Sequence, residues 1–110
     1  FKAPPAALSS GWKRHPGMPW VFVAEKSVPA KSGDTVNVSF SAKGRGRAKA
    51  LLFRYDGAGK WNGNSGGTVI DLKPDGSSFT LNLQVEESKR PTAEVYPAIS
   101  LFPHSDLFSL

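Results

Sequence analysis

Two short segments of this chain alternate strictly between apolar and polar side chains, and this alternation limits what the chain can fold into. In TVNVSFSA, residues 35–42, every second side chain is apolar, and SFTLNLQV, residues 78–85, repeats the arrangement. A period of two predicts half-buried β-strands, each with one face toward a core and the other toward solvent. No segment of the 110 residues carries a sustained helical stripe, so we expect an all-β fold.

Further strands are expected where apolar and aromatic runs lie between clusters of Gly, Pro, Asp and Ser, at 20–26, 47–55, 68–72, 93–102 and 106–110. Short strands spaced this closely predict an antiparallel β-sandwich or a jelly roll. Pro97 cannot donate to a sheet ladder, so 93–102 is expected to be an edge strand or a bulged one. Trp20 begins a predicted strand beside Phe22 and is expected in the core.

The first 19 residues differ in character from the rest of the chain. They contain four prolines and show neither strand nor helix periodicity, so we expect 1–19 to be a proline-rich arm or linker and 20–110 to be the sandwich domain. Trp12 lies in this arm and is expected to dock on its own domain or on a neighbour. A start at Phe1 without a methionine leads us to expect a processed or excised piece of a longer protein.

The charge of the chain is +5, and residues 1–60 hold 11 of the 14 Lys and Arg. This balance serves solubility and also favours contact with polyanions. The sequence KGRGRAK is expected to form a basic hairpin that either keeps a turn soluble or holds an acidic polysaccharide through Lys43, Arg45, Arg47 and Lys49. It offers no aromatic ring for base stacking, so we expect no nucleic acid partner. No apolar run is long enough for membrane insertion.

Motifs for catalysis and metal binding are missing from the sequence. GAGK at 57–60 resembles the end of a phosphate-binding loop, but Arg54 and Trp61 replace the required glycine and hydroxyl residue. The two histidines, His15 and His104, are not at metal-ligand spacing, and the chain has no cysteine. No nucleophile elbow is present. We therefore expect no enzyme, no metal and no cofactor.

The glycine-rich segment YDGAGKWNGNSGG, residues 55–67, is expected to be a long loop between two strands. Sugar rings stack their C–H faces on flat aromatic side chains, and amide, carboxylate and ammonium groups bind the hydroxyls. The candidate ligand-binding residues with this mixture are Tyr55, Asp56, Lys60, Trp61, Asn62 and Asn64. The alternatives are that Trp61 caps one end of the core or contacts another protein.

Two tyrosines leave a similar choice open. Tyr96 is expected on the strand face opposite Val95 and Ile99, and Tyr55 at the end of a strand. Either ring could line a concave sheet face, or be buried with its hydroxyl hydrogen-bonded.

The order of several short motifs resembles a known family. VPAKSGD (28–34) leads into the alternating strand TVNVSFSAKG (35–44), RYDGAGK (54–60) ends the next strand, and SSFTLNLQV (77–85) and DLFSL (106–110) follow. This order is similar to that of the galactose-binding-like jelly rolls, which occur as carbohydrate-binding modules and accessory domains of secreted glycoside hydrolases. The resemblance covers residues 27–110, although Ser78 replaces a tryptophan that often precedes the late strand.

The resemblance implies a noncatalytic accessory module of a carbohydrate-active protein, located outside the cell or in the periplasm. Its partner would be a glycan or the neighbouring domains of a larger parent chain. Some members of the family hold a structural calcium ion, and no residue of this chain is assigned to one. The alternatives are a purely structural sandwich that packs against a neighbouring domain through Trp12 and the arm, and polyanion attachment through the basic hairpin.

Overall fold

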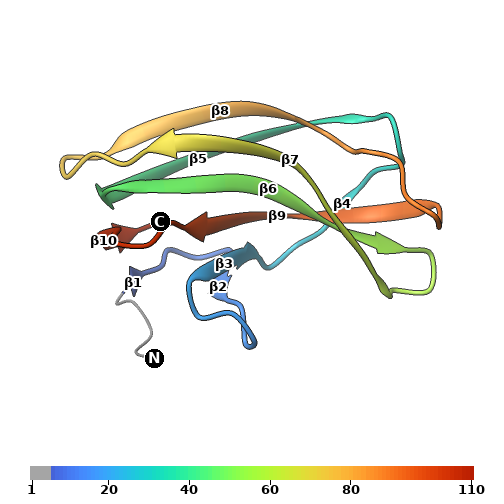
Figure 1. The fold of residues 1–110 in the computed structure, drawn as a ribbon, viewed down its shortest axis with the longest axis horizontal. Helices are drawn as coiled ribbons and strands as arrows, with labels where there is room; N and C mark the ends of the chain where they lie inside the picture. The colour runs from blue at the N-terminus through green and yellow to red at the C-terminus, as the bar shows by residue number, and fades with distance from the viewer. Residues whose placement is uncertain (1–5) are drawn as a thin grey trace.

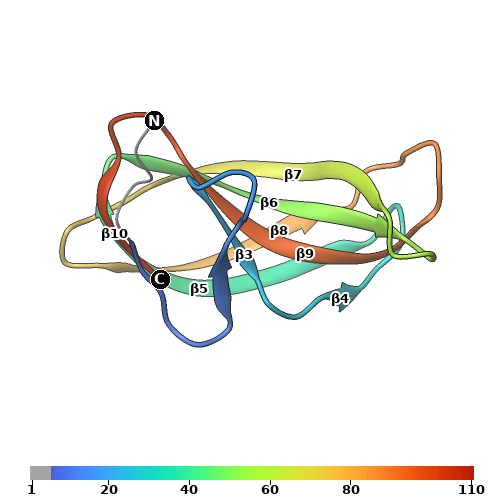
Figure 2. The ribbon, with the colours of Figure 1, turned by 90° about the horizontal axis from the view of Figure 1, so that it is seen from below.

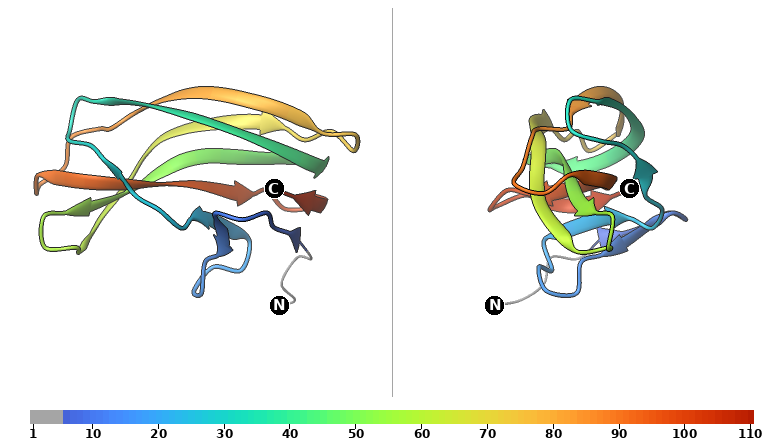
Figure 3. Two further views of the ribbon diagram at one scale, coloured as in Figure 1. Left: turned by 180° about the vertical axis from the view of Figure 1, so that it is seen from behind. Right: turned by 90° about the vertical axis from the view of Figure 1, so that its right-hand side faces the viewer.

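The computed structural model describes residues 6–110, which form two β-sheets and no helix. The spatial order in the four-stranded sheet is β1 (Ala6–Ala7), β10 (Asp106–Ser109), β5 (Thr35–Arg45) and β8 (Ser77–Gln84). The order in the six-stranded sheet is β2 (Trp12–Arg14), β3 (Val21–Ala24), β9 (Thr92–Leu101), β6 (Arg47–Asp56) and β7 (Trp61–Asp71), with β4 (Val28–Pro29) also pairing with β9. Figures 1 and 3 show β5 and β8 running together above β6 and β9. The predicted all-β sandwich is confirmed.

The main core lies between the two sheets, and the alternating strands supply it as expected. Val36, Val38 and Phe40 of β5 are buried, and the side chains between them are exposed. They pack with buried residues of the other sheet such as Leu52, which is fully buried. Phe108 of β10 also packs into this core. Burial of each large apolar side chain contributes about 1.5–3 kcal/mol, so this interface holds the sheets together.

The N-terminal segment belongs to the sandwich wherever the structure describes it. β1 pairs with β10 and β2 pairs with β3, so residues 6–14 are not a free arm, and residues 1–5 lie outside the described part. Trp12 docks on its own domain, edge-on to Phe40 with ring centroids 6.2 Å apart. Trp20 was expected in the core, but it precedes β3 and is 38% exposed, and Phe22 fills the core position instead.

The predicted loop at 55–67 is mostly strand. β7 begins at Trp61, directly after a tight turn, and pairs with β6 along its length. Two register shifts interrupt this pairing, and Gly63 and Gly66 lie at them with φ of 91° and 73°. Glycine reaches such positive φ values without steric cost, and extra residues at bulges break the period of two. The glycines therefore bend a strand here and do not form a loop.

The stretch with Pro97 was expected to be an edge strand or a bulged one. The edge alternative is wrong, whereas β9 does shift register against β6, between Glu94 and Thr92 rather than at Pro97. β9 lies inside the six-stranded sheet, with β6 on one side and both β3 and β4 on the other. Figure 2 shows β3 and β4 beside β9. β3 pairs with residues 98–100 of β9 and β4 with residues 94 and 95, so Pro97 lies between the segments that pair with the two short strands. The missing N–H of Pro97 is tolerated because no strand pairs with it on that side.

Candidate functional site

The outer face of the six-stranded sheet, which points away from the four-stranded sheet, carries a second apolar cluster. Val21, Val23, Leu51, Phe53 and Ala98 are buried there, and Met18, Tyr55 and Tyr96 pack against them. These side chains alternate along β3, β6 and β9 with the side chains of the main core. A sheet that faced plain solvent on this side would present polar residues instead. Other parts of the chain cover most of this cluster, and the half-buried Tyr55 and Tyr96 form the part of it that solvent reaches.

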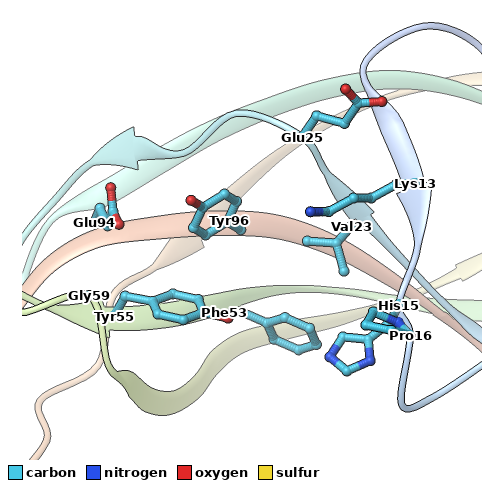
Figure 4. Close-up of a pocket in the computed structure, with 10 residues that line it drawn as sticks. All are labelled: Lys13, His15, Pro16, Val23, Glu25, Phe53, Tyr55, Gly59, Glu94 and Tyr96. Atoms are coloured by element: carbon cyan, nitrogen blue, oxygen red, sulfur yellow. The ribbon is translucent and has the colours of Figure 1, made fainter.

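A recess of about 310 Å³ opens in this cluster (Figure 4). It combines aromatic rings, charged groups and small residues from β2, β3, β6, β9 and the adjoining loops. The lining residues are Lys13, His15, Pro16, Val23, Glu25, Phe53, Tyr55, Gly59, Glu94 and Tyr96. Concave, mostly apolar sites with a few polar groups are the usual form of a binding pocket.

Three aromatic side chains form the floor of the recess. Tyr96 lies opposite Phe53 in the pairing of β9 with β6, and Tyr55 lies two residues further along β6. The rings of Tyr55 and Tyr96 meet edge to face, with centroids 5.2 Å apart. Both tyrosines are half-buried, and within residues 6–110 neither hydroxyl has a hydrogen-bond partner. The alternative in which these hydroxyls are satisfied internally is therefore wrong.

The loop after β2 forms one wall of the recess. The ring of His15 stands edge-on to Phe53, with centroids 6.0 Å apart. His15 Nδ1 accepts hydrogen bonds from the backbone N–H groups of Gly17 and Met18, at 3.0 and 3.1 Å. A ring nitrogen that accepts two hydrogen bonds carries no proton, so the proton of the neutral imidazole is on Nε2. The loop thus places a hydrogen-bond donor next to the aromatic floor.

Charged side chains stand around the aromatic floor, as Figure 4 shows. Ser27 Oγ donates a 2.8 Å hydrogen bond to Glu94 Oε2, which fixes the carboxylate beside Tyr55. Lys13 lines the recess from β2 and Glu25 from the segment directly after β3, and within the described residues their charged groups have no hydrogen bond or ion pair. These groups can donate to or accept from a ligand without breaking an internal contact.

Trp61 lies next to the recess rather than in it. It is the direct cross-strand partner of Tyr55, and paired residues project from the same face of a sheet. Its side chain is 58% exposed, so the interpretation of Trp61 as a plug for the core is wrong. The exposed ring of Trp61 is therefore accessible to a ligand.

Asp56 and Asn62, also predicted to bind a ligand, have structural roles. Asp56 Oδ1 accepts from the backbone N–H groups of Ala58 and Lys60, both at 2.9 Å. The hydrogen bond from Lys60 lowers the pKa of Asp56 from 3.8, helped by the bond from Ala58 and by the charge of Arg90 at 3.3 Å, although burial opposes this effect. Asp56 therefore holds the β6–β7 turn.

Asn62 points inward and is buried. Its amide nitrogen donates to Ser88 Oγ, to the Arg90 carbonyl and to Thr92 Oγ1 at 2.7–3.3 Å. The turn residue Lys60 and Asn64, which lies opposite Phe53, are exposed. Of the predicted ligand-binding residues, Tyr55, Trp61 and Asn64 thus share the outer face, whereas Asp56 and Asn62 brace the end of the sandwich.

The basic segment at 43–49 is not a hairpin within one sheet. Lys43 and Arg45 belong to β5 in the four-stranded sheet, and Arg47 and Lys49 belong to β6 in the other, with only Gly46 between them. All four side chains are exposed, and Arg45 forms two 2.9 Å hydrogen bonds with Asp106. The charges therefore face in different directions. Polyanion binding through these residues stays a prediction.

Several residues that line the recess were not among the predicted site residues. They are Tyr96, Phe53, His15, Glu25, Glu94 and Lys13. Only Tyr96 had a signal in the sequence, its alternation with Val95. The others come from separate strands that only the fold brings together.

Within residues 6–110, no three His, Asp or Glu side chains are grouped so that they could hold a metal ion. Nor does this part of the chain form a helix with the length and apolar character of a bilayer-crossing segment. Comparisons of the chain with protein-family models, with curated proteins and with solved structures found no match.

Proposed function

We propose that this protein is a noncatalytic glycan-binding module, and that the outer face of the six-stranded sheet is its binding surface. The observation that carries the proposal is the pair of half-buried tyrosines, Tyr55 and Tyr96, whose rings line a recess and whose hydroxyls have no hydrogen-bond partner in residues 6–110. Aromatic faces match the C–H faces of sugar rings, and free hydroxyls match sugar hydroxyls.

The charged groups around the rings support the same ligand class. A sugar hydroxyl both donates and accepts, so a site for it needs acceptors and donors close together. Glu25 and Glu94 supply acceptors, and Lys13 and the Nε2–H of His15 supply donors. The motif order that resembles galactose-binding-like jelly rolls agrees with this proposal, as does the sandwich architecture. We therefore also propose an extracellular or periplasmic parent protein.

Retention on polysaccharide gels tests the proposed function. We expect the wild-type protein to be retarded in native gels that contain at least one neutral polysaccharide from a panel of glucans, xylans, mannans and galactans. Tyr96→Ala should abolish the retardation. Trp20→Ala is the matched control, since Trp20 is exposed and does not line the recess. No retardation by any polysaccharide, or equal retardation of the Tyr96→Ala variant, would overturn the proposal.

Catalysis is a separate outcome of the same test. Two carboxylates beside a sugar-binding floor also occur in glycoside hydrolases. We expect no new reducing ends when the protein is incubated with a retained polysaccharide. Release of reducing ends that is lost in Glu94→Gln would show an enzyme and contradict the noncatalytic part of the proposal.

Packing against a neighbouring domain is the second candidate function. It is favoured by Val69, which is 49% exposed on β7, on the same face as Trp61 and Tyr55. A domain that covered this face would bury an apolar surface that solvent now reaches. In that case Trp61→Ala would weaken association with the adjoining domain and leave retention on polysaccharides unchanged.

A further inference from the structure

The aromatic recess and Trp61 form one continuous row of side chains across the six-stranded sheet. Tyr55 on β6 pairs with Glu94 of β9 on one side and with Trp61 of β7 on the other. Side chains paired in this way project from the same sheet face. Asn62, the next residue along β7, is buried whereas Trp61 is exposed, which agrees with an outward Trp61 side chain. Trp61 therefore extends the recess beyond its own lining.

This surface is longer than one sugar ring. From β7 through β6, β9 and β3 to β2, neighbouring strands are about 4.8 Å apart, so Trp61 and Lys13 stand about 19 Å apart across the sheet. A single hexose that stacks on Tyr96 cannot also reach Trp61 and Lys13. A ligand that uses the whole surface must therefore be several sugar rings long.

The charges of the surface favour a neutral ligand. Two carboxylates, those of Glu25 and Glu94, line the recess together with the Lys13 ammonium, and His15 adds the Nε2–H donor. A dense polyanion would meet two carboxylates, and a polycation would meet the Lys13 ammonium. Neutral hydroxyls can bind both kinds of group without repulsion.

We propose that the ligand is a neutral glycan chain of several sugars that crosses the strands of the six-stranded sheet, with Tyr55 and Tyr96 holding the inner sugars and Trp61 an outer one. This inference rests on the proposed glycan binding and adds the ligand's length, charge and direction. Trp61 acts as a separate stacking platform. Its contribution depends on how long the chain is.

Calorimetric titration with dimers and hexamers of β-1,4-linked glucose, xylose and mannose tests this inference. For the sugar type that binds, we expect the hexamer to bind at least about tenfold more tightly than the dimer. Trp61→Ala should weaken hexamer binding about five- to tenfold, as loss of one aromatic contact does, and change dimer binding less than about twofold. Tyr96→Ala should weaken both, and Trp20→Ala neither.

The outcomes separate this inference from the proposed function. If dimer and hexamer bind equally, or if Trp61→Ala weakens both to the same degree, the extended-chain inference is overturned and glycan binding stands. If none of the oligomers binds and no polysaccharide retards the protein, both are overturned. A dependence of hexamer affinity on salt beyond about twofold would contradict the neutral ligand, because screening acts on charged partners. Circular dichroism of Trp61→Ala, an exposed site, controls for misfolding.

Discussion

The ring of Tyr55 meets the ring of Tyr96 at 75°, with centroids 5.2 Å apart, on the sheet face that points away from the main core. The two rings come from neighbouring strands and hold each other in place, so the floor of the recess exists before any ligand binds. A preformed floor lowers the ordering cost of binding.

Two substitutions of Tyr96 separate the contribution of its ring to stability from that of its hydroxyl. Tyr96→Phe should leave the free energy of unfolding within about 0.5 kcal/mol of wild type, because no partner in residues 6–110 loses a hydrogen bond. Tyr96→Ala should cost about 1–2 kcal/mol, since a half-buried ring is lost. Urea unfolding measures both. A large loss of stability in Tyr96→Phe would mean that the hydroxyl is bonded after all.

Asn62 and Asn64 should respond in opposite ways. Asn62→Ala removes the hydrogen bonds that a buried amide makes to Ser88, Arg90 and Thr92, and should cost about 1–3 kcal/mol of unfolding free energy. Asn64→Ala removes an exposed side chain, so it should cost less than about 0.5 kcal/mol and weaken glycan affinity. Denaturant titration paired with affinity gels measures each variant. The division of roles is wrong if Asn64→Ala destabilises the protein as much as Asn62→Ala.

Asp56 should make stability depend on pH at the acid end. Its pKa is lower in the folded protein than in the unfolded chain, chiefly through the hydrogen bond from Lys60, so the ionised form favours folding. This contribution is present above the unfolded value of about 3.8 and is lost as the pH falls through the lower folded value. Asp56→Asn should therefore destabilise the protein at pH 7.

The difference between Asp56→Asn and wild type should shrink as the pH falls from 3.8 through the lower pKa of the folded protein, because the Asp56 carboxylate becomes protonated and neutral like the amide. Unfolding free energies from urea titrations at several pH values provide the comparison. A difference that stays constant down to pH 2 would show that charge at Asp56 does not matter.

Gly46 should tolerate substitution less well than other glycines. It joins the two sheets with φ of 98°, and an added Cβ would lie 2.8 Å from Ser105 Cα. Gly46→Ala should cost more than Gly33→Ala, where φ is 92° but nothing lies within 4 Å and the conformational cost alone is about 1–2 kcal/mol. Gly57→Ala, with open space and no positive φ, should be nearly neutral. Thermal unfolding ranks the three; equal Tm values for Gly46→Ala and Gly57→Ala would contradict the close approach.

The strands with a strict period of two were predictable because each has one buried face. The burial of Val36, Val38 and Phe40 and the exposure of their neighbours follow directly from that pattern. The first half of β7 was missed because Gly63 and Gly66 insert bulges that break the period. Pro97 is tolerated inside a sheet because it lies between the parts of β9 that pair with β3 and β4. This position relative to neighbouring strands cannot be predicted from the sequence.

The candidate site was predictable only in part. Tyr55 and Trp61 were identified because an aromatic residue near glycines and amides is typical of sugar-binding loops, and their pairing puts them on one face. Lys13, His15 and Glu94 join them from distant parts of the sequence, and only the pairing of β2, β3 and β9 brings them together. Asn62 was assigned to the ligand because strand alternation through the bulge was not visible in the sequence.

The most direct measurement is an NMR titration of ¹⁵N-labelled protein with the oligosaccharide hexamers. We predict that the largest amide shift changes map to the outer face of β6, β7 and β9, around Tyr55, Trp61 and Tyr96, and that the four-stranded sheet is unaffected. Changes confined to the outer face of β5 and β8, or no change with any glycan at millimolar concentration, would contradict the account.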